Sequence, residues 1–405
     1  MMGTRIQTAA MFQYFRLDDW VPADHLLRAV DRHVDLRPMR EQLRPLYSEI
    51  GRPSIDPEVL FRILLIGYLY GITSERRLLD EIGLNLAYRW FAGLGFDQSI
   101  PDHSTFSKNR HGRFRDSSVF RDLFEAIVQK CVDVGLVQGN RLSVDGTAIA
   151  ADASSKSRVS RQQFAEAAKV SRTLREYLTE VETANPVPSS EDQRPSGESG
   201  KISASDPDAT WATKGGVPPQ LSYYDNYLID NESNVILDVE ATPARFSQEV
   251  AAARTMIERA KTTFSIEPQS IGADKAYGSG QFLAWLLDQD IAPHIRVIDR
   301  TCQNAEFFTR DDFVFEPEIN AYRCPAGRLL TYAASGRASR VYTYNASPRD
   351  CAACPLKARC TAGRGRRLVV NFDGPARERT KQLNETEAYR RSWRERKKSR
   401  CSSLN

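Results

Sequence analysis

The order of strand-like and helix-like segments between residues 141 and 298 constrains the fold of this chain more than any other feature. Arg141–Ala150 has the pattern of a strand and carries a single acid, Asp145. Two strand-like runs, Leu221–Ile229 and Val235–Ala241, are joined by a turn-forming segment at 230–234. A helix, a strand, a helix and a strand then follow at Gln248–Lys261, Ser270–Ala273, Gly280–Asp288 and Ile291–Ile298. This order predicts an α/β domain, a mixed sheet with helices on both faces.

The segment before this domain, residues 1–136, is predicted to be all helical. Asp56–Tyr70 begins with a capping Asp and a Pro at the first helical position, and apolar residues on most faces predict a buried helix. A second helix is predicted from Thr73 to about Gly83, and a third begins near Ile100 and continues into a basic stretch. Short helices followed by basic residues are typical of a helix-turn-helix DNA reader, although a plain helical bundle gives the same pattern. The candidate DNA contacts here are Ser104, Lys108, Arg110 and Arg113.

Charge and composition divide the remainder of the chain. The core domain is predicted to span 137–302 and to contain a helical piece, Gln162–Val181, and a flexible loop at about 183–208 that is rich in Pro, Ser, Gly and Glu. A Cys-rich insertion at 303–372 and a basic C-terminal segment at 373–405 follow, the latter with one long helix over Pro375–Lys398. Residues 356–400 hold 15 Lys and Arg against 5 Asp and Glu. That excess indicates contact with a polyanion, or else a solvated charged helix.

Two acids stand at the ends of predicted buried strands. Asp145 lies in the first strand, and Asp274 directly follows Ser270–Ala273. A carboxylate at such a place is costly unless it is paired, bound to metal or exposed at the edge of the sheet. Two of them on neighbouring strands could share Mg²⁺, which prefers hard oxygen ligands and supports phosphodiester displacement. The alternative is that both are ordinary loop acids.

Four cysteines form a second cluster of candidate ligands. Cys324 is followed by Cys351, Cys354 and Cys360, the middle two in a CxxC pair. This spacing suits tetrahedral Zn²⁺ in a reducing compartment, where disulfides are rare. Unligated buried thiols and a redox or iron–sulfur role are the alternatives. Cys131, Cys302 and Cys401 do not fit this pattern.

Several motifs together resemble the DDE-type transposases of bacterial insertion sequences. The motifs lie, in order, at Ser143–Thr147, at Ser205–Ala209 with Lys214–Gly216, and at Ala273–Ser279, while Gly51–Pro53 and Ile100–Phe106 resemble the DNA-binding domain of that family. The resemblance covers nearly the whole chain. It implies a ribonuclease-H-like core in which two Asp and one Glu bind Mg²⁺, or Mn²⁺, for cleavage at transposon ends and strand transfer. Asp145 and Asp274 match the two aspartates, and relatives carry similar Cys-rich insertions.

The third acid of this family is not found where the resemblance places it. Relatives have an aromatic residue, an Arg three residues later and a Glu four residues after that. Here Trp393 and Arg396 are followed by Arg400. A one-base frame change would convert residues 399–403 into Val-Glu-Met-Leu-Phe, with Glu at position 400. Glu395 is a poor substitute because five residues on a helix place it about 140° from the required face.

Three functions are therefore weighed for the chain. The first is a Mg²⁺-dependent transposase acting on terminal inverted repeats and target DNA as a homodimer. The second is an inactive, truncated or frameshifted copy that only binds transposon ends. For either function, Arg396 and Lys397 are further candidate DNA contacts. A zinc-bearing regulator is the third, but it leaves the two strand-borne acids unexplained.

The longest apolar run, near Ile63–Tyr70, has about eight residues, whereas a membrane span needs about 20. The expected location is the bacterial cytoplasm, associated with the nucleoid when bound.

Overall fold

The computed structural model describes most of the chain. The described residues are 15–48, 50, 54–114, 117–153, 156, 158–160, 201–212, 218–244, 246–297, 307–336 and 340–402. The chain divides into two compact units, Met1–Cys131 and Val132–Asn405, and the division falls within helix α8 (Val119–Asp133). The predicted helical piece Gln162–Val181 and the motifs Gly51–Pro53 and Lys214–Gly216 lie outside the described residues.

The N-terminal unit is helical, as the sequence predicts. Its further elements are α1 (Leu17–Trp20), α2 (Leu26–His33), α3 (Arg37–Leu43), η1 (Arg44–Leu46), α4 (Pro57–Leu69), α5 (Glu75–Leu84), α6 (Leu86–Ala92), α7 (His103–Lys108) and the π-helical turn η2 (Asn109–Arg113). Asp56 caps α4 by accepting a hydrogen bond from the Glu58 amide at 2.9 Å. Leu60, Phe61 and Ile63 of α4 are almost fully buried in the core of this unit. A helix that is apolar on most faces is thus enclosed by its neighbours.

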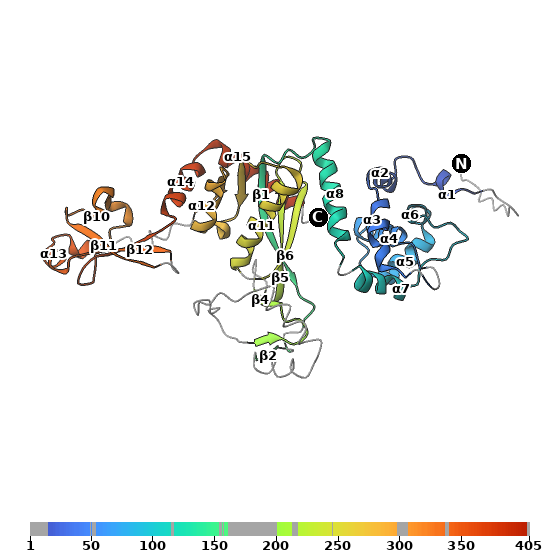
Figure 1. Cartoon of the computed structure of the whole chain (residues 1–405), viewed down its shortest axis with the longest axis horizontal. Coiled ribbons are helices and arrows are strands. Elements are labelled where there is room, and N and C mark those ends of the chain that lie inside the picture. The colour runs from blue at the N-terminus through green and yellow to red at the C-terminus, as the bar shows by residue number, and fades with distance from the viewer. Residues whose placement is uncertain are drawn as a thin grey trace, which may run out of the picture. The chain divides into compact units, whose positions relative to one another are not determined.

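The central sheet of the second unit is mixed and has six strands. They are β1 (Arg141–Ala150), β4 (Thr210–Ala212), β5 (Gln220–Asp230), β6 (Ile236–Pro243), β7 (Ser270–Ala273) and β8 (Ala292–Ile295). β5 pairs antiparallel with β1, β4 and β6, whereas β7 runs parallel to both β1 and β8. Figure 1 shows β1, β5 and β6 side by side. Apart from β4 and a shorter final strand, the strands follow the predicted order.

Helices cover this sheet along its length. α11 (Phe246–Phe264) packs against β5 and β6, α12 (Gly280–Asp288) and α14 (Gly374–Asn384) against β8, and α15 (Glu387–Ser402) against β7 and β8. The prediction of a single helix over Pro375–Lys398 is wrong. The structure has two helices there, because α14 ends at Asn384 and α15 begins at Glu387. Thr386 caps the new helix by accepting a hydrogen bond from the Tyr389 amide at 3.3 Å. The Asn384 side chain donates to the carbonyl of Ile295 at 3.0 Å and ties the break to the end of β8.

Two smaller sheets complete the described structure. β2 (Arg158–Ser160) pairs with β3 (Lys201–Ser203), so the end of the predicted flexible loop at 183–208 forms a strand. The Cys-rich segment forms a five-stranded antiparallel sheet. Its elements are η6 (Arg310–Asp312), β9 (Val314–Glu316), η7 (Pro317–Ile319), β10 (Ala321–Arg323), β11 (Leu329–Gly336), β12 (Val341–Ala346), α13 (Pro348–Ala352), η8 (Lys357–Arg359) and β13 (Arg367–Asn371). Across the described parts of the chain, no helix has both the length and the apolar character that crossing a bilayer requires.

Candidate functional site

The two predicted catalytic acids lie on neighbouring parallel strands. Ser143 of β1 is in register with Gly272 of β7, and two residues further along each strand come Asp145 and Asp274. Asp274 ends β7 and caps the 3₁₀ turn η4 (Lys275–Tyr277), where its Oδ1 accepts a hydrogen bond from the Ala276 amide at 2.7 Å. Parallel pairing therefore brings both acids to the carboxyl end of β7, an edge at which open α/β sheets commonly bind ligands.

A guanidinium from α15 contacts the first acid. Arg396 Nη2 lies 3.4 Å from Asp145 Oδ1, and the two side chains are only 11% and 20% exposed. Gly272 lies beneath this arginine, since a Cβ there would stand 3.9 Å from Arg396 Cδ, an ordinary contact distance, and a tight 3.0 Å from Ser143 Oγ. The sequence predicts Arg396 as a DNA contact, but the structure directs its side chain toward Asp145.

Tyr277 and Glu249 lie near the two acids, because the charges of Glu249, Asp145 and Asp274 all act on the Tyr277 phenol. The sequence analysis assigned neither residue to the site. Tyr277 is fully buried, and burial raises the pKa of its phenol well above its ordinary value. The negative charges of Glu249, Asp145 and Asp274 raise this pKa further, whereas Arg396 lowers it. Glu249 is a buried carboxylate in the first turn of α11. The available signal was an acid within the apolar start of a predicted helix, which by itself does not indicate where the acid points.

Glu395 and Ser392 fix α15 against the sheet. Glu395 accepts hydrogen bonds from Arg141 at 3.2 Å and from Arg391 at 2.9 Å, so its carboxylate is already engaged. Ser392 lies 2.7 Å from Nδ1 of the buried His294 on β8. Position 400 follows position 396 by one helical turn, although the Arg400 side chain lies outside the described residues. Lys397, the other predicted DNA contact of this helix, places its ammonium 3.8 Å from the centre of the Trp393 ring.

Acidification is expected to weaken the attachment of α15 through His294. Burial lowers the pKa of this imidazole below its ordinary value of 6.5, so the folded protein holds it neutral. The unfolded chain then binds more protons, and the stability contribution of His294 is lost as the pH falls from 6.5 through the folded-state pKa. Thermal melts between pH 7.5 and 5 should show a steeper loss of stability for the native chain than for His294→Gln. Parallel curves for the two proteins would contradict this role.

The four predicted zinc ligands line one small cavity. Cys324, Cys351, Cys354 and Cys360 meet there in a volume of about 20 Å³, and all four are free thiols. Burial raises the pKa of Cys360, the other three thiols raise it further, and Arg366 lowers it. Backbone amides of Arg328 and Arg366 donate to the Sγ atoms of Cys324 and Cys351 at 3.3 and 3.4 Å. Taken over the described residues, however, no group of three or more His, Cys, Asp or Glu side chains stands in an arrangement that could hold a metal ion.

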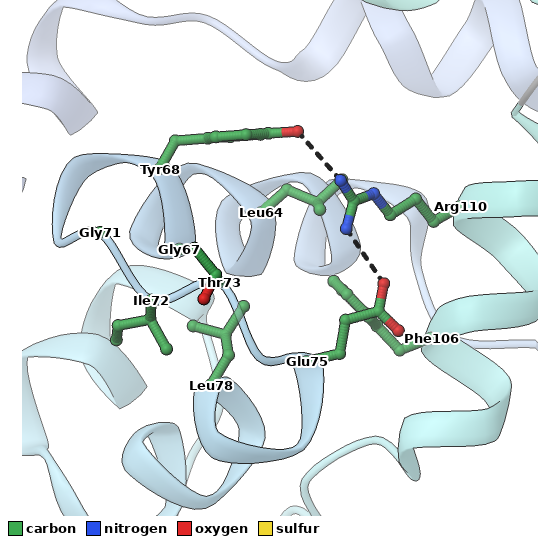
Figure 2. Close-up of a pocket in the computed structure, with 10 residues that line it drawn as sticks. All are labelled: Leu64, Gly67, Tyr68, Gly71, Ile72, Thr73, Glu75, Leu78, Phe106 and Arg110. Atoms are coloured by element: carbon green, nitrogen blue, oxygen red, sulfur yellow. Dashed lines mark hydrogen bonds and ion pairs between the residues drawn. The ribbon is translucent and has the colours of Figure 1, made fainter. Parts of the chain in front are cut away.

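The candidate DNA contacts of the N-terminal unit divide into two kinds. Ser104 and Lys108 are exposed on α7, which Asp102 caps by accepting a hydrogen bond from the Ser104 amide at 2.8 Å. Arg110 is instead partly buried and bound within the unit, 3.1 Å from Glu75 Oε1 and 3.2 Å from Tyr68 Oη. Figure 2 shows this guanidinium between the two oxygens, beside a pocket of about 270 Å³ with apolar walls. Arg113 lies over the Tyr47 ring at 4.1 Å.

Comparison with known proteins finds a family match within the N-terminal unit. The family described as "Transposase domain (DUF772)" matches residues 15–112. This match supports a transposase. No curated protein matches the chain. One solved structure, the cryo-EM structure of a piggyBac transposase synaptic complex with hairpin DNA, aligns at 10% identity with a TM-score of 0.28. The alignment covers 91% of this chain and 64% of that chain, and a TM-score this low does not establish a common fold.

Within the N-terminal unit, Arg110 and Lys108 should respond differently to truncation. Arg110→Ala removes a partly buried partner of Glu75 and Tyr68, and we expect it to lower the stability of this domain by about 1 kcal/mol. Lys108→Ala removes an exposed ammonium two positions away and should leave the melting temperature unchanged. Differential scanning calorimetry of both variants distinguishes the two roles. Equal melting temperatures for all three proteins would show that Arg110 is not a structural residue.

Proposed function

We propose that this chain is a DNA transposase of a bacterial insertion sequence, with a ribonuclease-H-like core that cleaves phosphodiester bonds and transfers strands at transposon ends. The observation that supports the proposal is that Asp145 of β1 and Asp274, directly after β7, each lie two residues beyond the registered pair Ser143 and Gly272 of two parallel strands. The match of residues 15–112 to a transposase domain supports it independently.

The residues of this site are suited to a divalent cation. Carboxylate oxygens are the hard ligands that Mg²⁺ or Mn²⁺ prefers, and such ions activate an attacking oxygen and stabilise the leaving one. The role of Asp145 and Asp274 would be to hold this charge beside the scissile phosphate. Arg396 already neutralises part of the charge on Asp145, so it would have to share that carboxylate. Asp274, capping η4, is positioned by the backbone and needs no rearrangement.

DNA recognition is proposed to begin in the transposase domain. Ser104 and Lys108 lie exposed on α7, where they could contact phosphates of the terminal inverted repeats. Arg110 and Arg113 would support that surface from within rather than touch DNA. We extend the proposal to a homodimer in the DNA complex, because two transposon ends must be brought together for strand transfer.

A second candidate function is DNA binding without cleavage. The observation that favours it is the pairing of Asp145 with a guanidinium, together with Arg400 in place of the third acid. With only two acids, one of them paired with Arg396, the site would hold divalent ions weakly. The chain would then occupy transposon ends as a repressor or a relic.

Nicking of end-labelled DNA separates the two functions. Duplexes containing the sequences that flank the gene are incubated with the chain and Mg²⁺, with EDTA as a control. Cleavage that disappears in Asp274→Asn supports the transposase, whereas a retarded but intact duplex supports the binding protein. Failure to bind the flanking sequences would contradict both.

We further propose that the four cysteines of this cavity close on a structural Zn²⁺ when it binds, because the thiols do not stand as a metal site in the positions that the structure gives them. The donation of two backbone amides to Sγ atoms supports this, since such donors favour the thiolate form that binds zinc. The purified chain is expected to contain one zinc per molecule by elemental analysis. Cys354→Ser should lose it and melt about 5–10 °C lower, whereas Cys131→Ser should retain it. Metal-free protein, or a Cys354→Ser variant that melts at the native temperature, would favour buried thiols without metal.

A further inference from the structure

An open groove lies between α14 and α15, at the end of β8, and its lining is unusual in composition. It has a volume of about 680 Å³, within the range of ligand sites. Its wall contains four cations, Arg296, Lys381, Arg390 and Arg394, and two aromatic rings, Tyr389 and Trp393. Glu385 is the one acid among the lining residues.

Trp393 is the feature that points to a specific occupant. Its side chain is 51% exposed, although a buried position would recover more hydrophobic free energy for so large an apolar ring. Lys397 stacks on the ring at 3.8 Å. An exposed aromatic ring among cations is the arrangement that binds single-stranded nucleic acid, where bases stack on the ring and phosphates contact the cations. A duplex keeps the faces of its bases covered, and an acidic peptide has no need of the ring.

Strand register and helix spacing relate the groove to the acid site. Ala273 of β7 is in register with Ile295 of β8, so the next residues, Asp274 and Arg296, stand beside each other at the same edge. Trp393 precedes Arg396, the residue that contacts Asp145, by one turn of α15. A strand lying in the groove would therefore continue toward Asp145 and Asp274.

The groove is held in shape before any ligand binds. Asn384 is tied to the Ile295 carbonyl at 3.0 Å, and the Tyr389 ring meets the buried His294 edge-on with centroids 6.1 Å apart. Glu387 pairs with Arg394 at 2.6 Å and with Arg390 at 3.5 Å, which positions both guanidinium groups at the rim. A pre-positioned rim reduces the entropy lost when a flexible strand binds.

We propose that this groove binds a single DNA strand, with an unpaired base stacked on Trp393 and its phosphates against Arg296, Arg390 and Arg394. The proposal rests on the proposed function and adds to it the form in which DNA enters the catalytic unit. A duplex end would have to open locally for its terminal nucleotides to reach the groove.

The test measures equilibrium binding of a fluorescent dT₁₂ strand to the full chain in EDTA, so that neither cleavage nor a metal contributes. Trp393→Ala is expected to weaken binding at least fivefold, and Trp393→Phe to restore most of it, because base stacking is worth about 1–3 kcal/mol. Trp211→Ala is the matched control, since Trp211 is 44% exposed and carries Arg158 on its ring at 4.0 Å. This variant should bind dT₁₂ like the native chain.

Cross-linking locates the strand independently of the affinities. A dT₁₂ strand containing 5-iodouracil should cross-link to the α15 peptide that contains Trp393. Unchanged affinity in Trp393→Ala, equal losses in Trp211→Ala, or cross-links only outside α14 and α15 would overturn the proposal. Binding of dT₁₂ through Trp393 by a chain that cuts no duplex would support the groove while refuting the transposase activity. Cleavage with dT₁₂ binding that is indifferent to Trp393 would refute only the groove.

Discussion

Replacing Arg400 by glutamate is expected to supply the proposed acid site with a third carboxylate and so to raise Mg²⁺-dependent nicking of transposon-end DNA. Position 400 stands one helical turn beyond Arg396, whose guanidinium contacts Asp145, so positions 396 and 400 share one side of α15. The new acid would offer the site a further carboxylate ligand. We expect Mg²⁺-dependent nicking to rise at least about 100-fold above the native chain, since even indirect ligand contacts are worth 10- to 100-fold.

The matched control for this gain is Arg400→Gln. Arg400→Gln removes the positive charge of the side chain without adding a metal ligand. An increase in nicking that Arg400→Glu shows and Arg400→Gln lacks therefore comes from the new carboxylate. Adding Asp145→Ala to Arg400→Glu should abolish the activity, while retardation of the duplex remains. If the native chain already cuts and Asp145→Ala stops it, another acid completes the site. Glu249 is then the candidate to mutate, because its charge acts on the same phenol as Asp145 and Asp274, whereas Glu395 is engaged by Arg141.

Binding to duplex ends should depend strongly on salt. Each phosphate contact made by Lys or Arg releases condensed counterions, so a protein with about 6–10 such contacts loses roughly 10³- to 10⁵-fold in affinity between 50 and 200 mM salt. We expect a loss of at least 10³-fold for the native chain, measured by fluorescence anisotropy on a duplex from the flanking sequence. Lys108→Ala should reduce the magnitude of the slope of log K against log salt by about 0.9, the value for one phosphate contact.

The arginines of the transposase domain provide the contrast for this measurement. Arg110→Ala should leave the slope unchanged once the domain is confirmed to be folded, because its guanidinium is bound to Glu75 and Tyr68. An affinity that hardly changes with salt would mean that phosphates are not the main contact, and it would count against both proposed functions. A slope that falls more for Arg110→Ala than for Lys108→Ala would reverse the roles assigned to the two residues.

Features that depend on neighbouring residues in the chain could be predicted from the sequence. The buried helix α4 is predicted by Asp56, Pro57 and the apolar run that follows them, because capping and the pattern of apolar residues are local properties of the chain. Alternation and turn residues likewise predict β5 and β6, and the acid after a short apolar run predicts Asp274 at the end of β7. The resemblance to DDE transposases selected Asp145 and Asp274 from among many acids.

Contacts between distant segments were decided only by the tertiary structure. Asp145 and Arg396 are 251 positions apart, and no local pattern indicates that α15 packs on β7 with this side chain toward the acid. The same holds for Glu249, whose burial depends on how α11 lies on the sheet, and for the break after Asn384, which depends on the Ile295 carbonyl. The sequence by itself determined which residues can carry charge at strand ends and helix faces. Packing decided which of those charges meet, because burial and pairing free energies depend on neighbours that the chain brings together only when it folds.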